Sequence, residues 1–262
     1  MFWLLLLQNV FSNKTSLEDL YLIPPYINGK GISSVVNLMG ENSILSHGSD
    51  QHIKLAYMSP NSAGALVYRN QLGIDKFLIE IKLNISDLKY KGQENHGILI
   101  FFTKSDNVEI GDFYGIKGDC DFAVALDIKE GLDVNIKVFV NNKMQKSVNY
   151  RFFEEDDVKI RIKQGDKLEV EADDTYDNVV VYDSDKYFIN KMSFLGISAS
   201  NGENTEASFA LRSVEFSNIK IVPKYFERGE REGNNKLTMV VFIISIGGII
   251  YYLYNQRNIK RV

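Results

Sequence analysis

Apolar and polar residues alternate with a period of two through much of the chain. The alternation is clearest in residues 77–83, 136–140 and 158–162, where every second residue is Phe, Ile, Leu or Val. A period of two is typical of β-strands that bury one face and expose the other. Residues 163–167, KQGDK, separate the last of these stretches from further alternation at 168–170, which predicts a hairpin with a short glycine-containing loop.

Many short strands separated by turns, with hardly any sustained helical period, predict an all-β domain. Long runs between paired strands favour a sandwich of two antiparallel sheets over a barrel. The chain has 262 residues, of which 45% are hydrophobic, so it can bury one sizeable core and we expect one such domain.

Two uniformly apolar segments lie at the ends of the chain. Residues 1–12 begin with MFWLLLL and end with Val-Phe-Ser, which predicts a signal peptide cleaved after Ser12. No basic residue precedes the apolar run, so an N-terminal anchor or a buried first strand stays open. Residues 237–254 are eighteen residues without a charge, and as a helix they would span roughly 27 Å, which predicts a transmembrane helix.

These ends set the expected organisation of the chain. Basic residues follow the predicted span, which places residues 255–262 in the cytosol and gives a single-pass type I membrane protein. We expect a lumenal domain at 20–222, followed at 223–236 by a polar stem that is too short for a coiled coil.

Charge and cysteine content narrow the choice of partners. The formal net charge is −4, and much of the basic charge near the C-terminus lies beyond the predicted span. The remainder is more acidic still, which argues against a nucleic-acid-binding surface. Cys120 is the only cysteine, so no intrachain disulfide can form, and we expect it to be a small core residue.

Several segments, in their order along the chain, resemble a known family. They include SAGALVY at 62–68, HGILIFF at 96–102, FLGISASNG at 194–202 and the strand pattern at 209–221. The order resembles that of the L-type lectin domains of the leguminous-lectin-like cargo receptors that cycle between endoplasmic reticulum and Golgi. Over roughly residues 20–222, the resemblance implies a concanavalin-like sandwich of two large antiparallel sheets and a role in selecting glycoprotein cargo.

The resemblance also implies a calcium-dependent sugar site, and this chain departs from it. The family has an Asp before the glycine of its sugar-binding strand, whereas this chain has His96. Asp127 is kept where the family's metal loop opens, but Lys129 and Gly131 follow it at positions where an aromatic residue and an Asn are expected. Calcium takes about six to eight oxygen ligands, so we expect no resident cofactor, and calcium binding at Asp127 is doubtful.

The remaining counterpart of the sugar-binding loops is the stretch that begins with Gly202 and Glu203. The degenerate carbohydrate site expected from the sequence therefore consists of His96, Asp127, Gly202 and Glu203. Asp127 lies between two apolar residues in strand alternation, so we expect it to project towards the ligand surface. A charged turn after Asp127 remains an alternative to a cation or sugar site.

A glycoside hydrolase on the same fold is a further alternative. Its Glu-x-Asp-x-x-Glu motif is matched at Asp127 and Glu130, but Ala125 stands at the first acid. Residues three apart on a strand point to opposite faces, whereas a retaining enzyme needs its two carboxyl groups on one face. We therefore expect no enzymatic activity.

The sequence as a whole predicts a lectin-like cargo receptor of the endoplasmic reticulum, the intermediate compartment or the Golgi membrane. Its expected partners are glycoprotein or protein cargo, with coat components at a sorting tail formed by Lys260, Arg261 and Val262. Family retrieval signals have a lysine at −3 and a second at −4 or −5; only Lys260 fits, so we expect weak retrieval. The alternative is a protein-binding scaffold module that needs neither sugar nor calcium.

Overall fold

The computed structural model describes part of the chain, namely residues 20–24, 26, 33–41, 43–47, 50–89, 96–128, 133–151, 157–173, 178–203 and 206–219. The expected signal peptide (1–12), stem (223–236), transmembrane helix (237–254) and cytosolic tail (255–262) lie outside these residues. Within the described ranges, no helix has the length and apolar character needed to cross a membrane.

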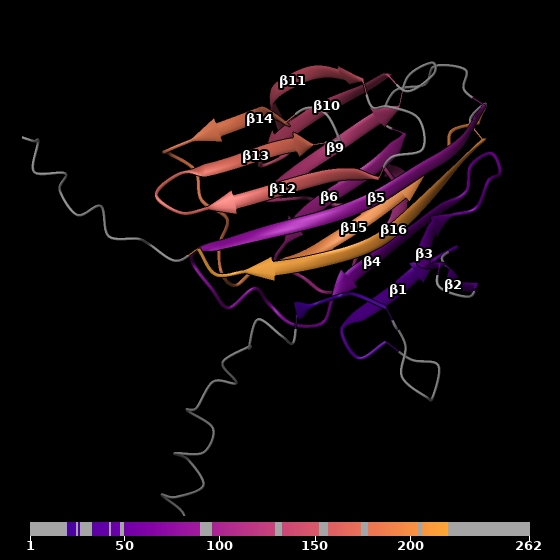
Figure 1. The fold of residues 1–262 in the computed structure, drawn as a ribbon, viewed down its shortest axis with the longest axis horizontal. Coiled ribbons are helices and arrows are strands. Elements are labelled where there is room, and N and C mark those ends of the chain that lie inside the picture. Colours follow the sequence, from indigo (N-terminus) through magenta and orange to yellow (C-terminus); the bar gives the residue numbers. More distant parts are fainter. Residues whose placement is uncertain are drawn as a thin grey trace, which may run out of the picture. The chain divides into compact units, whose positions relative to one another are not determined.

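Two seven-stranded antiparallel sheets are stacked face to face (Figure 1). Sheet I has the strand order β1 (Val36–Gly40), β4 (Ala63–Tyr68), β15 (Phe194–Ser200), β6 (Gly97–Thr103), β9 (Phe122–Ile128), β10 (Asp133–Val140), β11 (Lys143–Arg151). Sheet II has the order β14 (Asn178–Ser184), β13 (Leu168–Asp173), β12 (Val158–Gln164), β5 (Phe77–Lys89), β16 (Glu206–Ser217), β3 (Asp50–Ala56), β2 (Ser43–His47). A small hairpin is formed by β7 (Glu109–Phe113) and β8 (Ile116–Lys117). The predicted all-β sandwich is confirmed.

The main core lies between the two sheets and follows the predicted alternation. The apolar residues of β5 at its first four odd-numbered positions, from Phe77 to Leu83, have no exposed surface, and β12 contributes Ile160 and Ile162 to the same core. The hairpin between β12 and β13 also forms as predicted, with the Gly165 amide donating to the Lys167 carbonyl at 3.0 Å.

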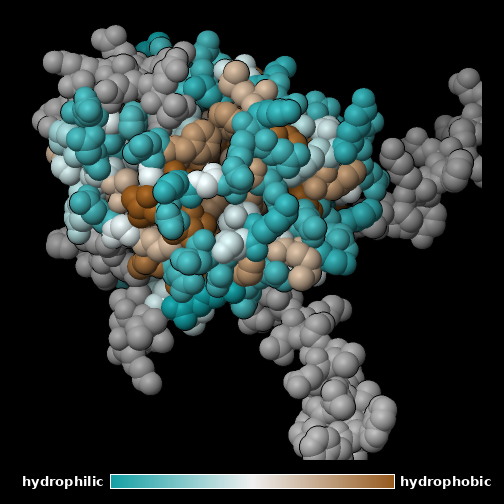
Figure 2. Space-filling model, turned by 180° about the vertical axis from the view of Figure 1, so that it is seen from behind, coloured by the Kyte–Doolittle hydropathy of each residue, from teal (hydrophilic) through white to brown (hydrophobic). Residues whose placement is uncertain are grey.

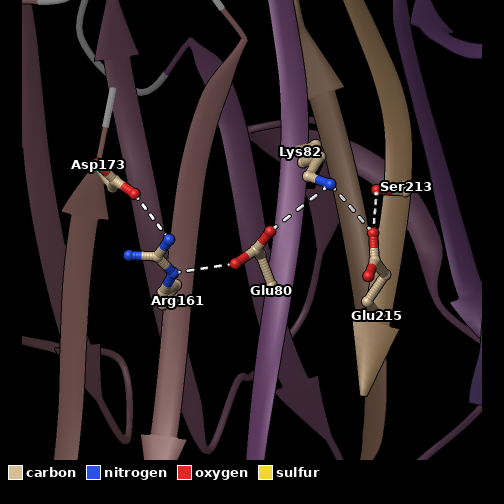
Figure 3. A network of polar contacts seen from close by, with 6 residues as sticks. All are labelled: Glu80, Lys82, Arg161, Asp173, Ser213 and Glu215. Carbon is tan, nitrogen blue, oxygen red and sulfur yellow. Dashed lines mark hydrogen bonds and ion pairs between the residues drawn. The ribbon is translucent and has the colours of Figure 1, made fainter. Parts of the chain in front are cut away.

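The outer face of sheet II carries the polar partners of this alternation. Arg161 on β12 contacts both Glu80 on β5, at 3.0 Å, and Asp173 on β13, at 2.7 Å. Lys82 lies between Glu80 and Glu215 of β16, and Ser213 completes the network (Figure 3). Three carboxylates and two cations thus alternate across four strands, and each of these charges contacts at least one of opposite sign.

The centre of sheet I differs from sheet II because it is apolar on both faces. Its strands β6 and β9 are buried at every position. A second hydrophobic cluster forms on the outer face, and the β7–β8 hairpin contributes to it; its buried members are Ala65, Val67, Leu99, Phe101, Tyr114, Ile116, Cys120, Ala123 and Ala125. Figure 2 views the molecule from this side and shows apolar atoms in the middle of the face, surrounded by hydrophilic ones. The hairpin and the outer face of the central strands of sheet I therefore form a second hydrophobic core, and Cys120 belongs to it as expected.

Candidate functional site

The sequence-predicted site residues converge at one end of three neighbouring strands of sheet I. His96 directly precedes β6, and the next residue, Gly97, is paired with Asp127 on β9 and with Ser200 on β15. The chain leaves β15 through Asn201 and reaches Gly202 and Glu203. Because β6 begins where β9 and β15 end, antiparallel pairing brings together residues that are far apart in sequence.

Gly97 allows the strands to approach closely at this end. Its φ is +135°, and a Cβ atom on it would collide with the carbonyl oxygen of Leu126 and lie 3.2 Å from the carbonyl carbon. Glycine has no Cβ and adopts positive φ without strain. The position of the His96 backbone beside β9 thus depends on glycine at 97.

His96 is half-buried, with its Nδ1 atom 3.4 Å from the Ser200 hydroxyl oxygen. Burial lowers the pKa of His96, while the nearby carboxylates of Asp112, Asp127 and Glu203 act in the opposite direction. The net effect favours a neutral imidazole at neutral pH, which can both donate and accept a hydrogen bond.

Asp127 projects from β9 to the outer face of sheet I, since Leu126 and Ile128 on either side belong to the core between the sheets. Its side chain is only 9% exposed. Oδ1 accepts a hydrogen bond from the Tyr114 hydroxyl group, which is in the turn of the β7–β8 hairpin. Oδ2 forms an ion pair with the Lys137 ammonium group from β10. Both carboxylate oxygens are therefore engaged by the protein itself.

The turn at Gly202 and Glu203 is held in place by the residue before it. The Asn201 side chain donates to the carbonyl oxygens of Tyr57 and Ala207, at 2.7 and 3.0 Å, and accepts from the Ala207 amide. Gly202 is buried and its carbonyl accepts from the Asn61 amide at 3.2 Å, whereas Glu203 is exposed. Glu203 is thus a solvent-facing carboxylate on an anchored turn.

The calcium ion implied by the family resemblance does not fit the described residues. Calcium requires about six to eight oxygen ligands, but the Asp127 oxygens already contact Tyr114 and Lys137. Among the residues with a defined position, no group of three or more His, Cys, Asp or Glu side chains is placed to hold a metal ion. Lys129, Glu130 and Gly131, which decide whether a charged turn follows Asp127, lie outside those residues.

Known structures share this sandwich. The legume lectin-like domain from Entamoeba histolytica matches with a TM-score of 0.64 and 16% identity, over 78% of this chain and 99% of that chain. The chain has a legume lectin-like fold. The Ca2+-bound VIP36 exoplasmic/lumenal domain matches with a TM-score of 0.63 and 16% identity, over 80% of this chain and 94% of that one. The Emp47p carbohydrate recognition domain matches with a TM-score of 0.58 and 22% identity, over 79% of this chain and 98% of that chain.

These matches confirm the L-type lectin-like sandwich predicted from the order of segments. No protein-family model and no curated protein matches the chain in sequence. Two of these neighbours are a legume lectin-like domain and a carbohydrate recognition domain.

Sequence reasoning missed the residues that hold this end of the legume lectin-like fold together. Tyr114 and Lys137 engage Asp127, and Asn201 anchors the turn that carries Glu203. Asn201 lies inside the FLGISASNG segment that carried the resemblance, so its position pointed to a role. Lys137 occupies an outward position of an alternating strand, where lysine is usually a solvated side chain, and no local pattern singled it out.

Proposed function

We propose that the chain is a single-pass type I membrane cargo receptor of the early secretory pathway with an L-type lectin-like lumenal domain. The observation that carries the proposal is the convergence of His96, Asp127 and Glu203 at one end of β6, β9 and β15 in a legume lectin-like sandwich. The cargo is glycoprotein selected for transport between endoplasmic reticulum and Golgi, and the tail residues Lys260, Arg261 and Val262 meet coat components.

Known neighbours support carbohydrate as the ligand class. The VIP36 exoplasmic/lumenal domain has a Ca2+/Man3GlcNAc-bound form with a TM-score of 0.61 against this chain. In this chain, the groups able to meet sugar hydroxyls are the His96 imidazole, the exposed Glu203 carboxylate and the backbone at Gly202. Asp127 has a structural role in the site and does not contact the ligand, because its two carboxylate oxygens are engaged by Tyr114 and Lys137.

The test is a glycan array probed with the full chain in detergent, once with millimolar calcium and once with a chelator. We expect binding to oligosaccharides in both conditions, reduced at least tenfold by Glu203→Gln, which removes a charge-assisted hydrogen bond. Glu109→Gln is the matched control, because this carboxylate is also exposed but lies on β7 in an exposed pair with Lys117. Absence of any glycan binding contradicts the lectin proposal.

A second function is a scaffold module that binds protein cargo without sugar. The internal engagement of Asp127 favours it, since the carboxylate that the family resemblance assigns to the ligand site is used for structure. Capture of cargo before and after enzymatic removal of its glycans separates the two functions. Capture that survives deglycosylation supports the scaffold, and capture that is lost supports the lectin.

A further inference from the structure

The Asp127–Lys137 ion pair is nearly closed off from solvent. The two side chains are 9% and 14% exposed, and the Lys137 ammonium group meets Oδ2 while the Tyr114 hydroxyl group meets Oδ1. By contrast, the Lys117–Glu109 pair on the neighbouring hairpin is 3.6 Å long and has side chains 74% and 76% exposed. Loss of one partner destabilises a buried ion pair more than an exposed one, because a buried charge that loses its partner cannot be solvated by water.

The register of sheet I explains how Lys137 reaches Asp127. Asp127 is paired across the strands with Asn135, and Lys137 is paired with Ala125. Lys137 and Asp127 are therefore diagonal neighbours on the same outer face, a separation that a long side chain spans. The small side chain of Ala125, which is buried in the outer cluster, leaves room for the aliphatic stem of Lys137.

We propose that the Lys137 ammonium group is the resident cation of this site and takes the place of the metal ion that the fold family implies. One ammonium balances one buried carboxylate. A divalent ion would have to displace it and find further oxygens, and the described residues around Asp127 supply no set of three or more acidic, His or Cys ligands. A tethered ammonium also has no dissociation equilibrium, so its occupancy does not depend on the concentration of free calcium.

The same cation positions the β7–β8 hairpin. Lys137 orients the Asp127 carboxylate through their ion pair, and Asp127 in turn accepts a hydrogen bond from Tyr114, the fully buried residue in the hairpin turn. The hairpin closes the outer hydrophobic cluster of sheet I. Lys137 is thus a positioning residue, and its effect on stability is measurable whether or not the chain binds sugar.

The test is thermal unfolding of the full chain in detergent, followed by the circular dichroism of its β-structure. Lys137→Met keeps the length of the side chain but leaves the Asp127 carboxyl group buried without its cationic partner, so we expect Tm to fall by about 5–10 °C. In the double variant Asp127→Asn, Lys137→Met both charges are gone while Asn can still accept from Tyr114, and we expect at least half of the loss to be recovered. Lys117→Met is the control for an exposed pair, with an expected change below about 2 °C.

Lys137→Arg provides the conservative variant and should keep Tm closer to the parent than Lys137→Met does. If Lys137→Met does not accumulate as folded protein, folding of the Arg variant and of the double variant still supports the resident cation. Calcium at millimolar concentration, compared with a chelator, should leave the Tm of the parent chain unchanged.

Two results overturn the proposal. One is a Lys137→Met variant that loses no more stability than Lys117→Met. The other is a calcium-dependent rise of several degrees in the Tm of the parent chain that disappears in Asp127→Asn, because that behaviour requires a metal ion at the carboxylate.

Discussion

Replacing Gly97 by Ala should disrupt the end of sheet I on which the candidate site is built. Two independent features of the structure disfavour a side chain there. The backbone φ of +135° is rarely adopted by residues with a Cβ, and the added Cβ would collide with the Leu126 carbonyl on the neighbouring strand β9. The collision can be relieved by moving β6 away from β9, whereas the strain is relieved only if φ itself changes.

The expected loss of stability in Gly97→Ala follows from these two features. A strained backbone of this kind costs about 1–3 kcal/mol, and each ladder hydrogen bond lost between β6 and β9 adds about 1 kcal/mol. We therefore expect Gly97→Ala to lower the free energy of unfolding by about 3–5 kcal/mol, which corresponds to a fall in Tm of about 10 °C for a domain of this size.

Two other glycines separate strain from collision. Gly118 has a φ of +131° but nothing within 4 Å of an added Cβ, so Gly118→Ala reports backbone strain alone. Gly165 has its nearest neighbour, Ile219 Cδ1, at an ordinary 3.7 Å, so Gly165→Ala reports neither effect. We expect losses of about 1–2 kcal/mol for Gly118→Ala and within about 0.5 kcal/mol of zero for Gly165→Ala.

The assay is chemical unfolding of the three variants and the parent in urea, with the unfolding slope checked for constancy. The expected order of stability loss is Gly97→Ala, then Gly118→Ala, then Gly165→Ala. A Gly97→Ala variant that is no less stable than Gly118→Ala would refute the close approach of β9 as the reason for glycine at 97.

Three further outcomes are expected. Although partial burial alone would raise the pKa of Glu80, the hydrogen bond and charge of Arg161 lower it, and the hydrogen bond from Lys167 lowers that of Glu169. Both carboxylates stabilise the fold at pH values above their ordinary pKa of 4.5, and this contribution is lost as pH falls below that value. When the urea midpoint of unfolding is measured against pH, Glu80→Gln should reduce the loss of stability on the acid side. An unchanged acid-side loss would contradict the stabilising role of ionised Glu80. Burial raises the pKa of Cys120 to about 12, so iodoacetamide at pH 8 should label the thiol only after unfolding, and mass spectrometry that finds rapid labelling of the folded chain would count against its place in the core. At the tail, Lys260→Ala with Arg261→Ala should shift the chain away from early secretory membranes in microscopy; an identical distribution would reduce these residues to determinants of topology.

The faces of the strands were predictable from local sequence. Phe77, Ile79 and Ile81 point into the core and Glu80 and Lys82 to solvent, because successive side chains on a strand must alternate. The same rule placed Asp127 on the outer face of β9. The order of segments resembling L-type lectins drew attention to His96, Asp127 and Glu203, and the carboxylates of Asp127 and Glu203 lie close enough to His96 to act on its pKa.

Only the tertiary structure decided which groups contact the Asp127 carboxylate. Its ion pair with Lys137 depends on the register between β9 and β10, since a shift of one residue would send Lys137 to the opposite face. Its hydrogen bond from Tyr114 depends on how the β7–β8 hairpin packs on sheet I. The sequence by itself determined the alternation and therefore the sandwich, because that pattern is imposed by backbone geometry. Register and packing depend on contacts between distant segments, so the ion pair of Lys137 with Asp127, the residue for which the resemblance implies a metal ligand, emerges only when the strands are assembled.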